Sequence, residues 1–222
     1  MKKVIITGAT GMVGKGILLE CLDHNEISEV LSIGRNNIGM DHPKLKELVH
    51  KDFSDFSLVK NQLKDYDACY YSLGISAAGL TEEAYTTISH DYTLALANIL
   101  FENNPHMTFN YVSGEGTDSS EKGRMMWARV KGKTENDLLK IGFKQATMFR
   151  PGMIIPLKGI KSRTKSYQFM YDYLMWFVKL IKVMAPNSVV NTTQIGLAMI
   201  NSMLKGYDEK VLKPKDIIAL SR

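Results

Sequence analysis

Short apolar runs alternate along this chain with longer stretches in which apolar residues recur every three or four positions. The runs at 3–7, 30–33, 45–50, 67–72, 107–113 and 144–150 are typical of strands, and 216–220 is predicted to be one more. Helical spacing marks 12–22, 81–103, 124–140 and 193–204. This alternation predicts an α/β fold in which helices cover both faces of a doubly wound parallel sheet.

The alternation fades after residue 150. The rest of the chain is predicted to add a small C-terminal helical elaboration, with helices at 167–184 and 193–204. The 222 residues contain no internal repeat and no linker rich in Pro, Gly or Ser, and they are few for two domains. We therefore expect a single domain over 1–222.

The most hydrophobic segment, 167–184, is apolar almost all round but carries Asp172, Lys179 and Lys182. A membrane-spanning helix needs about 20 apolar residues with few charges, so this segment is not expected to span a bilayer. Three roles stay open: packing on the domain and on a second subunit of a homodimer, a lid over a pocket for an apolar or planar substrate, or a helix on a membrane surface. The basic cluster before it either faces solvent or attracts an anionic substrate, and comprises Lys158, Lys161, Arg163 and Lys165.

Composition narrows the class of protein. The apolar share of 45% excludes a disordered chain. The 28 Lys and Arg residues outnumber the 23 Asp and Glu residues, but they are scattered and form no run that would bind nucleic acid. The two cysteines, Cys21 and Cys69, cannot build a disulfide framework. The apolar run after Met1-Lys2-Lys3 is shorter than the roughly 7–15 residues of a secretory signal, so we expect a cytoplasmic protein.

The sharpest motif is Thr7-Gly8-Ala9-Thr10-Gly11-Met12-Val13-Gly14, between the first strand and the first helix. Gly8 allows a tight turn, Gly11 leaves room for a pyrophosphate beside the backbone, and Gly14 lets the helix pack closely on the strand. The amino end of the helix offers free N–H groups and a positive dipole to phosphates. A plain glycine turn is the alternative. In this context we expect a dinucleotide site on a Rossmann-like sheet, with Thr10, Met12 and Val13 among its contacts.

The second and third strands end in residues that can select the dinucleotide. Arg35 stands where NAD-binding proteins place an acid for the ribose 2′-hydroxyl, and an arginine suits a 2′-phosphate, so NADP(H) is favoured over NAD(H). A solvated loop arginine is the alternative. After the third strand, Asp52 could bind the adenine amino group and Phe53 could cover the base. A cap for the next short helix is an equal alternative for this pair.

Seven segments share a pattern with a known family. They are Thr7 to Gly14, Gly34-Arg35, Asp52-Phe53, Ser72-Leu73-Gly74, Tyr111-Val112-Ser113, Lys131-Gly132-Lys133-Thr134-Glu135 and Arg150-Pro151-Gly152. Together they resemble the extended and atypical short-chain dehydrogenase/reductases, in particular NmrA-like and epimerase/dehydratase-like members, over nearly the whole chain. The resemblance implies an NAD(P)-binding Rossmann fold, with the cofactor across the carboxyl ends of the strands and in contact with Leu73 and Gly74. It also implies a substrate side built by 151–222.

The family transfers hydride with a serine and a Tyr-x-x-x-Lys pair. The two residues share a helix face, the ammonium lowers the pKa of the phenol, and the phenol exchanges a proton with the substrate. The resemblance places Lys131 on the nicotinamide ribose, and Ser113 or, by spacing, Gly114 in the serine position. Trp127 occupies the tyrosine position, and its indole N–H can orient a carbonyl group but cannot relay a proton. The candidate catalytic residues are therefore Lys131, Ser113 and Trp127.

Loss of a general acid–base slows a reaction about 10²–10⁴-fold. Tyr85, Tyr92 and Tyr111 are candidates for a substitute donor, although each is also typical of a packing tyrosine. The five histidines show no ligand spacing, so no metal is expected. The leading hypothesis is a reductase of a small carbonyl compound, and its rival is a non-catalytic, dinucleotide-dependent sensor or assembly factor. A nucleotide-sugar epimerase or dehydratase fits less well, because it also relies on the missing tyrosine and on a larger substrate domain.

Overall fold

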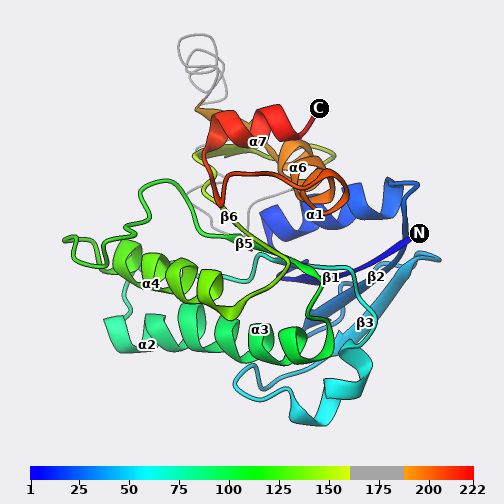
Figure 1. Cartoon of the computed structure of the whole chain (residues 1–222), viewed down its shortest axis with the longest axis horizontal. Helices are drawn as coiled ribbons and strands as arrows, with labels where there is room; N and C mark the ends of the chain where they lie inside the picture. The colour runs from blue at the N-terminus through cyan, green and yellow to red at the C-terminus, as the bar shows by residue number, and fades with distance from the viewer. Residues whose placement is uncertain (161–187) are drawn as a thin grey trace.

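Seven parallel strands form the central sheet of the computed structural model, which describes residues 1–160 and 188–222. Their order is β3-β2-β1-β4-β5-β6-β9 (Figure 1). The strands are β1 (Lys2–Thr7), β2 (Ile27–Gly34), β3 (Leu45–Val49), β4 (Ala68–Tyr71), β5 (Thr108–Val112), β6 (Gln145–Phe149) and β9 (Val211–Leu212). A separate parallel pair consists of β7 (Met153–Ile155) and β8 (Val189–Asn191).

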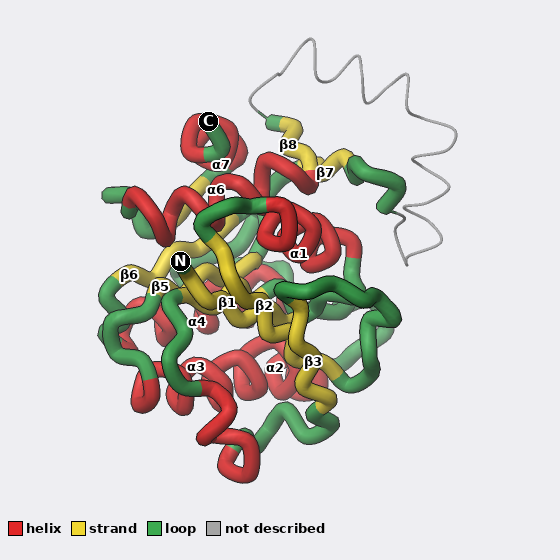
Figure 2. The backbone as a smooth tube through the Cα atoms, turned by 90° about the vertical axis from the view of Figure 1, so that its right-hand side faces the viewer, coloured by secondary structure: helices red, strands yellow, loops and turns green. Residues whose placement is uncertain are grey.

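Helices cover both faces of this sheet. Figures 1 and 2 show α1, α6 and α7 on one side and α2, α3 and α4 on the other, which confirms the predicted doubly wound fold with a C-terminal helical part. The helical elements are α1 (Met12–Asp23), η1 (Ser57–Leu63), α2 (Glu82–Thr86), η2 (Thr87–Asp91), α3 (Tyr92–Asn103), α4 (Met126–Ile141), α6 (Thr192–Lys205) and α7 (Pro214–Leu220). In the described ranges, no helix combines the length and apolarity needed to cross a bilayer. The predicted helix at 167–184 lies outside them.

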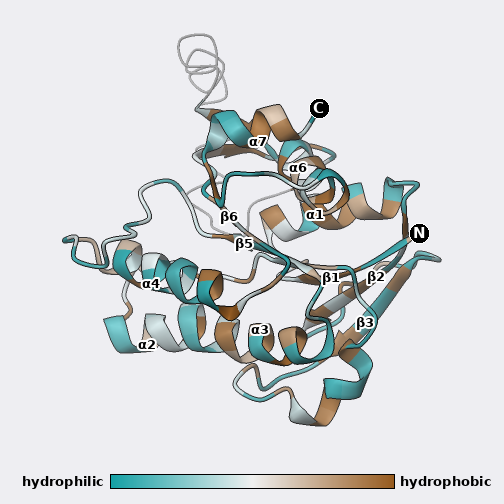
Figure 3. Ribbon diagram, in the orientation of Figure 1, coloured by the Kyte–Doolittle hydropathy of each residue, from teal (hydrophilic) through white to brown (hydrophobic). Residues whose placement is uncertain are grey.

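The central strands β1 and β4 are apolar over 4–6 and 68–71 because the sheet is buried on both faces there, whereas the edge strand β3 contains Lys46 and Glu47. In β1, Val4 and Ile6 point into one core with Ile17 of α1, whereas Ile5 points into the other core with Leu96 of α3. All five side chains are fully buried. Figure 3 shows hydrophobic and hydrophilic residues alternating along α1, α3 and α4, as expected for helices that pack on a sheet with one face.

The strand order places a crevice at the carboxyl end of β1. The chain runs outward from β1 to β3 and then crosses to β4 on the other side of β1, so the connections after β1 and β4 leave in opposite directions. In open α/β sheets, ligands bind at such a switch point. The turn between β1 and α1, which contains the glycine motif, lies at this place.

Two predicted elements differ in the structure. Residues 216–220 belong to helix α7, so the predicted strand is wrong. Pro214 starts this helix, the Asp216 carboxylate accepts a hydrogen bond from the backbone N–H of Lys213 at 2.9 Å, and Ile217 and Leu220 lie one helical turn apart on its buried side. The predicted helix at 81–103 is interrupted by a π-helical turn, η2, between α2 and α3.

Candidate functional site

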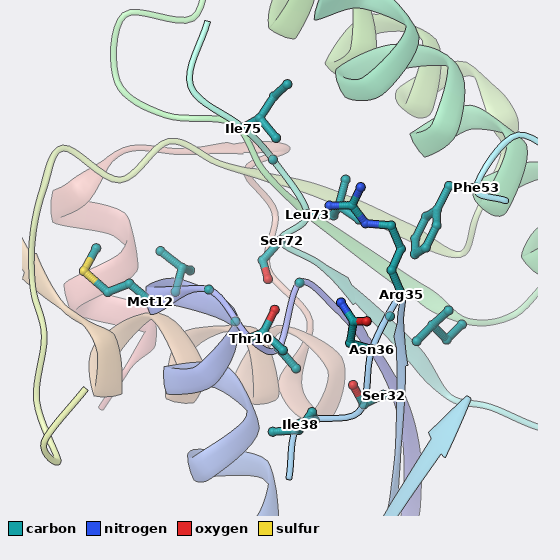
Figure 4. Close-up of a pocket in the computed structure, with 18 of the residues that line it drawn as sticks. Thr10, Met12, Ser32, Arg35, Asn36, Ile38, Phe53, Ser72, Leu73 and Ile75 are labelled. Atoms are coloured by element: carbon teal, nitrogen blue, oxygen red, sulfur yellow. The ribbon is translucent and has the colours of Figure 1, made fainter. Parts of the chain in front are cut away.

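A cavity of about 1030 Å³ lies at the carboxyl ends of β1, β2 and β4. This volume is at the upper end of the range of about 300–1,000 Å³ for ligand pockets. Figure 4 shows Thr10 and Met12 at the amino end of α1, Arg35 at the end of β2, and Ser72 and Leu73 after β4, all around one space. Every residue of the glycine motif from Gly8 to Gly14 lines this cavity. The predicted dinucleotide contacts that share this cavity are Gly8, Thr10, Gly11, Met12, Val13, Gly14, Arg35, Phe53, Leu73 and Gly74.

Two glycines of the motif are required by the protein itself. Gly8 has φ +71°, and a Cβ on it would lie 2.7 Å from the Ser72 carbonyl oxygen. A Cβ on Gly14 would overlap the Gly8 carbonyl oxygen and lie 2.6 Å from Ser72 Oγ. Ser72 Oγ also donates a hydrogen bond to the Thr7 carbonyl oxygen at 2.7 Å, which ties the end of β4 to the end of β1. These contacts fix the shape of the turn.

The fold of the protein does not by itself require a glycine at position 11. Its φ of −84° and ψ of 168° are open to any residue, and a Cβ there would meet a single atom within 4 Å, the Gly8 carbonyl oxygen at 3.3 Å. A side chain on Gly11 would instead occupy part of the cavity that this residue lines. Helix α1 also begins without a side-chain cap and without an acidic residue in its first turn. The motif therefore fits a pyrophosphate, which needs close backbone approach and uncapped N–H groups.

The end of the cavity beside β2 and β3 carries positive charge. Arg35 and Lys51 both line it, together with Asn36 and Ser32. In Figure 4 the Arg35 side chain extends from the end of β2 into the cavity. No Asp or Glu belongs to the cavity wall formed by the described residues. This lining favours an anionic group over a bare ribose diol, which is usually held by a carboxylate.

Asp52 and Phe53 separate in the structure. Phe53 lines the cavity, is 2% exposed, and packs edge-on against Phe56 at a centroid distance of 5.4 Å. The Asp52 side chain is exposed and does not line the cavity; its Oδ1 accepts a hydrogen bond from the backbone N–H of Ser54 at 2.9 Å. The bonds from Ser54 hold the pKa of Asp52 below its usual value. Asp52 therefore stabilises the turn at 52–54 and does not cap the next helix, because η1 begins after Phe56 without a side-chain cap.

The three candidate catalytic residues lie outside the cavity wall. The Ser113 hydroxyl donates to Glu135 and to the Phe149 carbonyl oxygen, the latter at 3.1 Å. The Lys131 ammonium donates to the Ser113 carbonyl oxygen. Burial lowers the pKa of Lys131 to about 8, although the nearby Glu135 carboxylate opposes that shift. Trp127 is partly buried, and its ring lies close to Gly116.

Glu135 is the centre of this network. It is 1% exposed and forms an ion pair with Arg150, whose Nε lies 3.0 Å from Glu135 Oε1. Sequence reasoning noted both residues as parts of family segments but did not predict their pairing, which joins α4 to the end of β6. A buried carboxylate needs such a partner, so the pair supports the local fold of the region that carries Ser113 and Lys131.

The candidate substitute donors are divided between core and cavity. Tyr85 and Tyr111 are each 2% exposed, and burial raises the pKa of both phenols. Tyr92 lines the cavity, with its ring 6.3 Å from that of Phe53. Lys158, predicted as part of a basic cluster, forms ion pairs with Glu20 and Asp23 of α1, while the other members of that cluster lie outside the described residues.

Sequence reasoning also missed part of the cavity wall. Lys51, Ile88, Met153 and Ile154 line it. Lys51 could have been found, because it directly follows the predicted strand 45–50 and parallel strands end at one edge. The others had no such signal. Within the described ranges, no group of three or more His, Cys, Asp or Glu residues is placed to hold a metal ion.

The chain is similar in sequence to several known proteins and in fold to solved structures. It is 27% identical to Protein HTATIP2 of Rattus norvegicus over 156 residues, which are 69% of this chain and 63% of the rat protein. It is 26% identical to Protein fmp52-1, mitochondrial, of Aspergillus terreus over the whole length of both chains. The crystal structure of the Bordetella bronchiseptica enzyme WbmF in complex with NAD+ superposes with a TM-score of 0.70 at 14% identity, covering 98% of this chain and 76% of WbmF.

These relatives overturn one expectation. The proteins from Aspergillus terreus, Saccharomyces cerevisiae and Candida albicans that resemble this chain are all named as mitochondrial, so the cytoplasmic location expected from the sequence is contradicted. A low cysteine count and a lack of export signal do not distinguish the two compartments.

The family model for NAD dependent epimerases and dehydratases matches residues 4–122, which contain the glycine turn, Arg35 and strands β1 to β5, and the cavity lies at the ends of β1, β2 and β4. With its seven-stranded Rossmann-like sheet and its NAD(P)-binding turn, this chain belongs to the NAD dependent epimerase/dehydratase family.

Proposed function

We propose that this protein binds NADP(H) and uses it to reduce a small carbonyl compound. The observation that carries the cofactor choice is the cavity end with Arg35 and without a carboxylate in its described wall. An NAD-binding site would place an acid there for the ribose 2′-hydroxyl, whereas a guanidinium pairs with a 2′-phosphate. The glycine turn supplies the neighbouring pyrophosphate position, with Gly11 leaving the backbone accessible.

Apolar residues of the cavity wall support the choice of substrate. They include Ile75, Ile88, Met153 and Ile154. Reduced nicotinamide, when bound, would supply a hydride to the carbonyl carbon, and the carbonyl oxygen would take its proton from Tyr92, the candidate donor that lines the cavity. Apolar side chains around that position exclude water and leave space for a small organic molecule rather than for a highly charged one.

Binding of the two dinucleotides tests the cofactor assignment. Calorimetric titration is expected to give a lower Kd for NADPH than for NADH. Arg35→Asp should weaken NADPH and improve NADH, because the carboxylate repels a 2′-phosphate and accepts from a 2′-hydroxyl. Absence of binding of either dinucleotide at millimolar concentration would refute the whole proposal. An NADH preference in the wild type would refute the Arg35 argument alone.

A second candidate function is that of a non-catalytic sensor or assembly factor whose conformation depends on the dinucleotide. It is favoured by Trp127 in the tyrosine position and by the hydrogen bonds of the Ser113 and Lys131 side chains, which are made to the protein. In this arrangement neither side chain lines the cavity. Binding energy would then be used to stabilise one conformation of the chain rather than a transition state.

Turnover with a panel of aldehydes and ketones separates the two candidates. The reductase predicts NADPH oxidation by the wild type and its loss in Lys131→Ala. The sensor predicts no oxidation by the wild type, and a gain of oxidation in Trp127→Tyr, which restores a phenol four residues before Lys131. Circular dichroism of each variant checks that the fold is unchanged.

A further inference from the structure

The carboxyl ends of β2 and β3 bring two cationic side chains to the same end of the cavity. The strands are parallel neighbours with Gly34 opposite Val49, and the backbone N–H of His50 donates to the Gly34 carbonyl oxygen at 2.9 Å. Arg35 directly follows Gly34, and Lys51 directly follows His50. Both line the cavity. The sheet register therefore places the two residues at the ends of neighbouring strands, on the wall of one cavity.

Neither charge is neutralised by the described protein. The structure gives Arg35 and Lys51 no hydrogen bond or ion pair with any described side chain, in contrast to Lys46 on β3, which pairs with Glu29 at 2.6 Å. The nearest carboxylates in sequence have other partners. Asp52 accepts from Ser54, and Glu47 accepts from the backbone N–H of Ile38 at 2.9 Å.

We infer that Lys51, with Arg35, binds the phosphomonoester at the adenosine end of the cofactor, which is the 2′-phosphate of NADP(H). This inference rests on the proposed function. A phosphomonoester carries a charge of about −1.5 to −2 at pH 7, so a single guanidinium leaves part of it uncompensated. Arg35 can make a bidentate contact with the phosphate. Lys51, on the segment that follows the neighbouring strand β3, adds a second positive charge on a flexible side chain.

The placement also explains selectivity. NADH lacks the phosphate, so Lys51 has no group of opposite charge to meet at this end and contributes little to its affinity. Both cations act on the same dianion, so the preference for NADPH should exceed what Arg35 alone provides. Because both side chains are exposed, the preference should weaken as salt concentration rises.

The test compares Lys51→Gln with Lys64→Gln, a matched change at an exposed lysine that does not line the cavity. Calorimetry measures Kd for NADPH and NADH, and for the fragments adenosine 2′,5′-bisphosphate and 5′-AMP. We expect Lys51→Gln to weaken NADPH and the bisphosphate about tenfold, equivalent to about 1.4 kcal/mol, and to leave NADH and AMP unchanged. Lys51→Arg should retain the preference, and Lys64→Gln should behave as the wild type.

Three results would overturn the inference, and they are distinguishable. If Lys51→Gln binds NADPH as tightly as the wild type while Arg35→Gln binds it more weakly, Lys51 does not belong to the site, and the proposed function stays intact. Equal weakening of NADPH and NADH by Lys51→Gln shows a structural effect rather than phosphate recognition. Failure of the wild type to bind either dinucleotide refutes the proposed function together with this inference.

Discussion

Replacement of Gly11 by alanine separates binding from folding. The residue has φ −84° and ψ 168°, which alanine adopts without strain, and its Cβ would touch the Gly8 carbonyl oxygen at 3.3 Å with no other atom within 4 Å. Gly-to-Ala replacement at a compatible site gains about 0.4–1 kcal/mol through the unfolded chain. Loss of glycine at a helix N-cap costs a similar amount, so the free energy of unfolding should change by less than about 1 kcal/mol.

The effect on the cofactor should be much larger. If the cofactor binds as proposed, the added methyl group occupies the position where its pyrophosphate approaches the amino end of α1. Hydrogen bonds to charged groups are worth about 1.5–3 kcal/mol each, so displacement from one or two backbone N–H groups should cost about 3 kcal/mol. That is roughly a hundredfold increase in Kd for NADPH. Calorimetry measures the affinity, and urea unfolding without ligand measures stability.

Gly14→Ala is the matched control. Its Cβ would overlap the Gly8 carbonyl oxygen and crowd Ser72 Oγ, so this variant should lose stability by about 1–3 kcal/mol or more. A folded Gly11→Ala protein that binds NADPH with wild-type affinity would refute the assignment of the pyrophosphate to this turn. A Gly14→Ala protein as stable as the wild type would refute the packing argument.

Further predictions concern stability and pH. Glu135→Ala leaves the Arg150 charge without its buried partner and should lower the free energy of unfolding by about 3–5 kcal/mol in urea titrations, whereas a loss below 1 kcal/mol would contradict a structural role for the pair. The folded-state pKa of Lys131, about 8, lies below its unfolded value, so the unfolded chain binds more protons between these two values. Stability of the wild type relative to Lys131→Met should therefore rise from pH 8 to pH 10 and stay level below pH 7, and a difference that falls with pH would refute this. Gly16→Val should destabilise the contact of α1 with α6, because a Cβ on Gly16 would lie 2.5 Å from Thr192 Cβ; an unchanged midpoint of thermal unfolding would argue against close packing of these helices.

Much of the site could be predicted because its signal is local. Each role of the glycine turn follows from residues three positions apart, and Arg35 follows directly from the end of an apolar strand. The turn, Arg35 and Phe53 do line one cavity. Asp52 shows the limit, since the sequence offered an adenine contact or a helix cap, whereas in the structure its carboxylate accepts a hydrogen bond from Ser54 and lies outside the cavity wall.

The sequence by itself determined the alternation of strands and helices as far as residue 150 and the position of the phosphate-binding turn, because periodicity and glycine spacing act over a few residues. The tertiary structure alone decided which side chains share a partner. The pairing of β2 with β3 brings Arg35 and Lys51 to the ends of neighbouring strands at one cavity, and α4 packs on β6 with the Lys131 ammonium bonded to the Ser113 carbonyl oxygen and outside the cavity wall. Such contacts join residues far apart in the chain, and burial and hydrogen bonding between them leave no spacing in the sequence from which they can be read.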